Sequence, residues 1–170
     1  MRKGFALAAA MLAGGTLAVQ TAVAGPEGKD VLEFDTMAGV VEPFTGAANP
    51  VRGVPGGGLP WQLDRARGDL RSDGRLDVRV NGLVLARRAP VPANLQGTNP
   101  IPQFRAIVSC LTPGNGGTTA DTVNVQTDPV PASPDGDARI KARVALPDPC
   151  IAPIVFVTSP AGMWFAATGT

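Results

Sequence analysis

Hydrophobic and polar residues alternate with a period of two along several short stretches of the chain. In residues 75–81, Leu76, Val78 and Val80 are separated by charged or amide side chains, and residues 138–144 repeat this pattern. A period of two is typical of a β-strand with one buried face, whereas no long stretch sustains the period of an amphipathic helix. The pattern therefore predicts a chain built from strands.

Turn-forming residues precede both alternating stretches. Ser72-Asp73-Gly74 comes before the first, and Pro134-Asp135-Gly136 comes before the second. An Asp side chain accepts local backbone hydrogen bonds, and Gly adopts the positive φ that tight hairpin turns require. We therefore expect residues 64–71 to pair with residues 75–85 as a long hairpin. Gly82 interrupts the alternation and predicts a bulge or bend.

Further strands are expected over residues 101–111, 118–127, 151–158 and 163–168. The run Ile154-Val155-Phe156-Val157 is apolar at every position, as in a central strand that is covered on both faces. About seven or eight short antiparallel strands predict an all-β fold, either a single β-sandwich or a small barrel. This domain is expected to span residues 51–170, after an N-terminal extension at 25–50 with room for one strand.

The first 24 residues have the pattern of a secretory signal peptide. Arg2 and Lys3 precede an apolar run that closes at Ala22-Val23-Ala24, and signal peptidase requires such small residues. We expect cleavage after Ala24 and a secreted, extracellular protein without membrane insertion. The alternative, an uncleaved membrane anchor, needs a longer strongly apolar run.

Cys110 and Cys150 are the only cysteines of the chain. An exported protein matures in an oxidising compartment, so these two residues are predicted to form a disulfide. A redox-active thiol is the competing interpretation. It favours a nearby cation or a C-x-x-C spacing, and the neighbouring residues supply neither. The predicted bond is structural.

The composition excludes several classes of chemistry. The chain has no His and no Tyr, which removes histidine-dependent catalysis and histidine metal sites, and its net charge of +1 does not favour nucleic acid. The loop Gly56-Gly57-Gly58 lacks the Lys of a phosphate-binding loop and is predicted to be a flexible tight turn. The sequence indicates no catalytic residue, no metal-ligand set and no cofactor.

Two sets of residues are candidates for ligand binding. The predicted hairpin carries more basic than acidic residues, which favours an anionic ligand, although a solvated sheet face is the alternative. The aromatic candidates can stack on sugar rings if they are exposed, although each has apolar neighbours and core packing is the alternative. The basic candidates are Arg65, Arg67, Arg71, Arg75 and Arg79, and the aromatic ones are Trp61 and Trp164.

Short motifs give two resemblances. The segments GGLPWQ at 57–62, GDARI at 136–140 and PCIAPIVFV at 149–157 resemble a family of uncharacterised secreted bacterial proteins. That resemblance implies export but no assigned activity. Residues 66–70 and 74–83 resemble the opening hairpin of the chordin-type extracellular repeat, an all-β module. The histidines that this module usually carries are absent here.

These observations favour a secreted, non-catalytic binding or structural module that is associated with the cell envelope. The expected partner is an anionic envelope polymer, a glycan or another extracellular protein, and not nucleic acid. Two alternatives stay open. One is a small glycan-directed hydrolase that uses paired carboxylates. The other is a secreted inhibitor that presents the Pro-rich loop at 89–102.

Overall fold

The computed structural model describes residues 28–114 and 116–169, and the signal peptide expected at 1–24 lies outside them. The described residues form strands and turns without a helix, and every pairing between strands is antiparallel. This confirms the all-β prediction. No segment of the described chain forms a helix of the length and hydropathy needed to span a membrane.

One sheet has four strands and contains the predicted hairpin. Its order is β1 (Asp30–Phe34), β4 (Arg65–Arg71), β5 (Arg75–Asn81) and β10 (Ala138–Arg143). Gly74, in the turn between β4 and β5, has φ of 83°, as the turn chemistry predicts. A Cβ at this position would overlap the carbonyl oxygen of Val144, so the turn also requires glycine for close packing.

The second sheet has six strands, and a small third sheet has two. The larger one runs in the order β2 (Ala38–Gly39), β12 (Trp164–Ala167), β11 (Ile151–Thr158), β7 (Gln103–Pro113) and β8 (Ala120–Gln126), with β9 (Val130–Pro131) also paired to β7. The small one pairs β3 (Trp61–Gln62) with β6 (Val84–Leu85).

The described chain thus has twelve strands, more than the seven or eight expected. The additional strands include β2, β3, β6 and β9, each of two residues. Two residues are too few to show an alternating pattern, so periodicity does not reveal them. The segment expected as an N-terminal extension contains β1 and β2, which lie at the edges of two different sheets.

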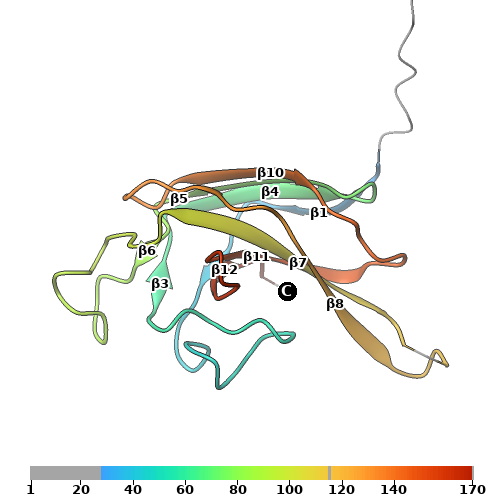
Figure 1. The fold of residues 1–170 in the computed structure, drawn as a ribbon, viewed down its shortest axis with the longest axis horizontal. Coiled ribbons are helices and arrows are strands. Elements are labelled where there is room, and N and C mark those ends of the chain that lie inside the picture. The colour runs from blue at the N-terminus through green and yellow to red at the C-terminus, as the bar shows by residue number, and fades with distance from the viewer. Residues whose placement is uncertain (1–27, 115, 170) are drawn as a thin grey trace, which may run out of the picture.

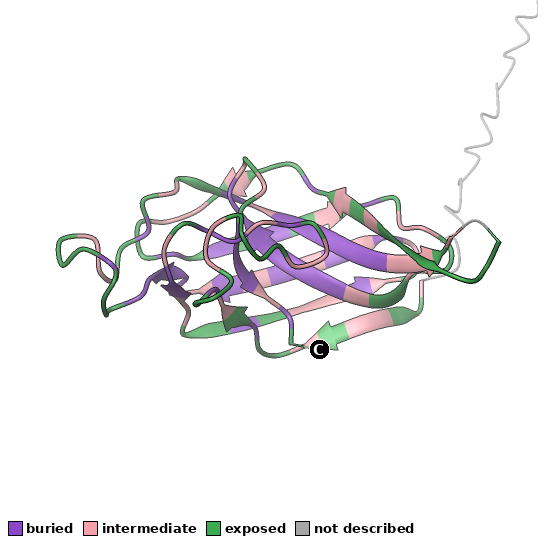
Figure 2. Cartoon of the chain, turned by 90° about the horizontal axis from the view of Figure 1, so that it is seen from below, coloured by how far each residue is buried: buried purple, intermediate pink, exposed green. Residues whose placement is uncertain are grey.

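The four-stranded sheet lies over the six-stranded sheet, and the core fills the space between them (Figures 1 and 2). Leu70 and Val78 of the upper sheet and Phe104 of the lower sheet are fully buried. At one end of this core the Trp61 ring stacks on Phe165 at 4.0 Å between centroids, and Phe104 meets both rings edge-on. This aromatic cluster is part of the continuous hydrophobic core.

The apolar run of the central strand β11 is buried on both faces, as its sequence predicts. Residues 154–157 are at most 6% exposed. The segment 51–57 approaches this sheet, because Gly57 donates a backbone hydrogen bond to Trp164 and Trp164 donates one to Pro55. Gly56 and Gly57 are themselves buried, and a Cβ at Gly56 would overlap the carbonyl oxygen of Phe44. Two glycines of the loop are therefore close-packing positions, which corrects the flexible turn that the sequence predicts there, whereas Gly58 is exposed with open space around it.

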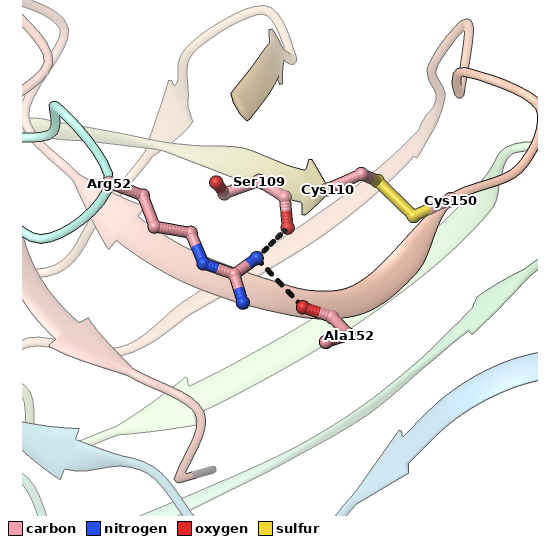
Figure 3. Close-up of a disulfide and its surroundings, with 5 residues drawn as sticks. All are labelled: Arg52, Ser109, Cys110, Cys150 and Ala152. Carbon is pink, nitrogen blue, oxygen red and sulfur yellow. Dashed lines mark hydrogen bonds between the residues drawn. A yellow bond between two sulfur atoms is a disulfide. The ribbon is translucent and has the colours of Figure 1, made fainter. Parts of the chain in front are cut away.

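The predicted disulfide joins Cys110 on β7 to Cys150, just before β11 (Figure 3). Beside it, the Arg52 guanidinium donates hydrogen bonds to the carbonyl oxygens of Ser109 at 3.1 Å and Ala152 at 2.7 Å. The pairing of β7 with β11 shifts register between Ile151 and Ile154. The disulfide and Arg52 therefore hold the two strands together where their ladder is irregular.

Candidate functional site

Three arginines form a row across the outer face of the four-stranded sheet. Arg67 on β4 pairs with Arg79 on β5, which in turn pairs with Arg139 on β10. Adjacent strands in a sheet lie about 4.8 Å apart, so the row spans about 10 Å. Only Arg139 has an ion pair, since neither Arg67 nor Arg79 has a salt bridge or a side-chain hydrogen bond within the described residues.

A row of acids lies next to this arginine row. The register places Glu33, Asp69 and Asp77 opposite one another across β1, β4 and β5, with Lys141 at the end on β10. The Asp77 carboxylate accepts two hydrogen bonds from Arg139, at 3.1 and 2.7 Å, and lies 3.3 Å from the Lys141 ammonium. The face therefore alternates between positive and negative stripes that run across the strands.

The other basic candidates on the hairpin are compensated or lie further along the strands. The Nε atom of Arg71 lies 3.5 Å from a carboxylate oxygen of Asp30 and 3.8 Å from one of Asp69. The Nε atom of Arg75 lies 2.8 Å from a carboxylate oxygen of Asp73. Arg65 is exposed and pairs in register with Asn81. The five arginines predicted from the sequence thus fall into two groups. Arg71 and Arg75 are ion-paired near the turn, whereas Arg65, Arg67 and Arg79 have no ion pair within the described residues.

A shallow depression of about 630 Å³ opens over the centre of this face. Its lining includes the three arginines of the row together with the acids Glu33, Asp35 and Asp69. The depression brings together residues from all four strands. Of the five basic candidates, Arg67 and Arg79 line it, whereas Arg65, Arg71 and Arg75 do not.

Ionisation of the acids on this face is favoured by their basic neighbours. Hydrogen bonding from Arg139 lowers the pKa of Asp77 below its ordinary value of 3.8, against the opposing effect of burial. The same pair raises the pKa of Arg139. Burial of Asp73 opposes ionisation, but hydrogen bonds from Arg75 and the charge of Arg143 outweigh it and lower the pKa of this carboxyl.

These shifts predict a loss of stability in acid. Because the pKa values of Asp73 and Asp77 are lower in the folded than in the unfolded chain, their contribution is complete above the unfolded value of 3.8 and is lost as pH falls through the folded values. The melting temperature is expected to decline below about pH 4. In Asp77→Asn the decline should be shallower, as measured by thermal unfolding from neutral pH downwards. The control Asp135→Asn changes an exposed residue without an ion pair in the described structure and should follow the wild type; equal slopes for all three proteins would contradict the assignment.

Both tryptophans lie in the interior and not on the charged face. Trp61 is 4% exposed and Trp164 is 5% exposed. The Trp61 ring stacks on Phe165, and the Trp164 ring lies 5.9 Å from that of Phe156 between centroids. Successive residues of a strand point to opposite faces, so Trp164 and Phe165 lie on opposite sides of β12. Neither indole is available to stack on a sugar, and the core-packing alternative is the correct one.

Arg139 is the basic residue of the site that the sequence did not select. The alternation over residues 138–144 predicts a strand with Arg139 on its polar face, but this strand, β10, is distant from the hairpin in the sequence. Only the pairing of β10 with β5 places Arg139 beside Arg79. Glu33 and Asp35 were missed for the same reason, since β1 joins β4 from the N-terminal side.

In the part of the chain that the structure describes, no group of three or more His, Cys, Asp or Glu side chains is arranged to hold a metal ion. Comparison with known proteins gives no match to a family model, to a curated protein or to a solved structure. The fold and site by themselves define the class: an all-β, disulfide-bonded protein with a striped charged sheet face. The two resemblances drawn from short motifs stay predictions.

Proposed function

We propose that this protein is a secreted, non-catalytic binding module, a β-sandwich that holds an anionic polymer of the cell envelope on its four-stranded sheet. The observation that carries the proposal is the pair Arg67 and Arg79. The two lie directly opposite each other on neighbouring strands, line a depression and have no acidic partner among the described residues. The contact surface is the row formed by these residues and Arg139.

The energetics of the row favour an external anion. Like charges directly opposite on neighbouring strands destabilise a sheet, and the register places Arg67 and Arg139 on either side of Arg79. A carboxylate, sulfate or phosphate offers the paired oxygens that a guanidinium binds through two parallel hydrogen bonds. A ligand with such groups would convert an unfavourable surface into a compensated one.

The neighbouring acids define the direction of the ligand. Glu33, Asp69 and Asp77 form a negative row beside the arginines and would repel a polyanion that ran along the strands. A polymer that crosses the strands meets the arginines in succession, about 5 Å apart, and avoids the acids. The site therefore suits a linear chain with anionic groups repeated at a comparable spacing.

The hydrolase alternative has one point in its favour, because Asp69 and Asp77 lie opposite each other and both line the depression. Glycoside hydrolysis requires one carboxylic acid that retains its proton near neutral pH. Arg139 lowers the pKa of Asp77, which makes that residue a poor proton donor. The charge arrangement is better suited to holding an anion than to cleaving a glycosidic bond.

The proposal predicts that the mature protein binds polygalacturonate or poly(glycerol phosphate) and does not bind neutral dextran. The double variant Arg67→Ala/Arg79→Ala should bind at least about tenfold more weakly, because two charge-assisted contacts are lost. Binding is measured by biolayer interferometry on immobilised polymer at low and moderate salt, and the affinity should fall as salt rises.

The matched control is Arg87→Ala/Arg88→Ala, which removes the same charge from two exposed arginines outside the sheet face. It should retain most of the wild-type affinity. The site is refuted if both double variants lose affinity equally, since only net charge would then matter. The proposed function itself is refuted if the wild-type protein binds neither polymer at low salt and retains nothing from purified envelope.

A further inference from the structure

The edge strand β8 lacks the protection that the other sheet edges carry. An exposed strand edge pairs readily with another strand unless it is short, bulged or charged. In this protein β2 has two residues, β1 shifts register between Asp30 and Leu32, and β10 carries Arg139, Lys141 and Arg143. By contrast, β8 has seven residues, pairs with β7 without a register shift and has Asp121 as its single charge.

The free side of β8 presents unpaired backbone groups. Thr127 donates its N–H to Ala106 at 3.0 Å, and the Thr119 carbonyl accepts from Gly114 at 2.9 Å. Both positions continue the register of β8 with β7, so the odd-numbered residues of β8 direct their backbone groups toward β7. The even-numbered residues therefore direct theirs away from the sheet. Within the described residues, no backbone hydrogen bond reaches them from that side.

We propose that β8 pairs antiparallel with β8 of a second copy of this chain and joins two six-stranded sheets across a two-fold axis. The register centred on Val123 matches Ala120 with Gln126 and Thr122 with Asn124, so it uses every outward-facing residue of the strand. Asp121 then lies opposite Val125 of the second copy. No like charges meet in this arrangement.

The charges that would face each other exclude the same kind of self-pairing at β10. Centred on Lys141, that arrangement sets Lys141 against Lys141 and Arg139 against Arg143, so every polar-face pair is repulsive. The break between β8 and β9, at residues 127–129, limits the length of the β8 edge. A symmetric contact between two short strands of equal length is therefore favoured over an open-ended one.

The symmetry has a consequence for ligand binding, and this step alone rests on the proposed function. A two-fold axis that relates antiparallel strands of one sheet is perpendicular to that sheet. Within one copy, the four-stranded sheet lies over one face of the six-stranded sheet (Figure 1), and this axis keeps that face on the same side in both copies. Both arginine rows therefore lie on one side of the dimer, where a single polymer can contact them together and bind with avidity.

The dimer is tested by sedimentation equilibrium of the mature protein between micromolar and millimolar concentration. The wild type should dimerise, and Thr122→Pro should weaken the dimer at least about tenfold, because proline removes an outward N–H without breaking the ladder to β7. Thr122→Val keeps the N–H and serves as the matched control. Its dissociation constant should stay close to the wild-type value.

Two oppositely charged variants at one position distinguish loss of the dimer from loss of the fold. Val123 is half-buried and meets its own copy at the axis, so Val123→Lys and Val123→Glu should each be monomeric through like-charge repulsion. An equimolar mixture should form the heterodimer, which shows that both variants are folded. A wild-type monomer at every concentration overturns the proposal, and so does a dimer that is insensitive to these changes. Polymer binding by a monomeric wild type would leave the proposed function intact.

Discussion

Replacing both Cys110 and Cys150 by serine is expected to lower the free energy of unfolding by about 4 kcal/mol. The bond links residues 40 positions apart, and chain-entropy theory assigns a loop of this length a stabilisation of that size because the unfolded chain is constrained. A small domain has a net stability of about 5–15 kcal/mol, so this loss is a large fraction of the whole.

The location of the bond explains why the loss is not recovered elsewhere. Cys110 is fully buried on β7, and Cys150 precedes β11 at the point where these strands change register. Without the bond, Arg52 still joins the carbonyl groups of Ser109 and Ala152 across this irregularity, and the backbone ladder resumes at Ile154. The start of β11 is therefore expected to separate first from β7.

The measurement is urea-induced unfolding of the oxidised wild type and the double serine variant, followed by tryptophan fluorescence. Reduction of the wild type with a thiol should give the same shift of the midpoint as the double substitution, which separates loss of the bond from loss of the sulfur atoms. A difference below about 1 kcal/mol between oxidised and reduced protein would show that the bond is not a major source of stability.

Truncating Phe104 to alanine is the second change with a large expected effect, a loss of about 3–5 kcal/mol. The ring is fully buried between the sheets and meets Trp61 at 6.3 Å and Phe165 at 5.8 Å between centroids. Its removal leaves a cavity among aromatic side chains that cannot collapse around the missing volume, so the lost transfer energy and the cavity cost add together.

Unfolding in urea, followed by circular dichroism, checks this value. Phe44→Ala is the matched control, because the same side chain is removed at a position that is 42% exposed. It should change stability by less than about 0.5 kcal/mol. If the two substitutions cost the same, the aromatic cluster is not the organising element of the core.

The elements with long alternating patterns were predictable from the sequence. The hairpin of β4 and β5, the positive φ of Gly74 and the burial of β11 on both faces follow from local rules, because the side-chain period and the turn geometry depend only on neighbouring residues. The two-residue strands were not predictable, since their pairing is imposed by contacts with distant segments.

The candidate site was predictable only in part. The basic character of the hairpin was visible in the sequence, but Arg71 and Arg75 are compensated by acids, and the partner Arg139 comes from a distant strand. Residue type and strand period alone do not distinguish a compensated arginine from an uncompensated one. The exposure of Trp61 and Trp164 was not predictable either. An indole in the core and an indole in an exposed sugar-binding platform can both have apolar neighbours in the sequence, and only the structure shows that these two are buried.

By itself the sequence determined the all-β class, the main hairpin, the single disulfide and the identity of the polar and apolar faces of the longer strands. Only the tertiary structure decided which strands are neighbours beyond that hairpin, and therefore that Arg139 extends the row of Arg67 and Arg79 while β8 keeps a free edge. The physical reason is that a strand's period assigns each side chain to a face, whereas its register with a distant strand depends on packing of the whole core.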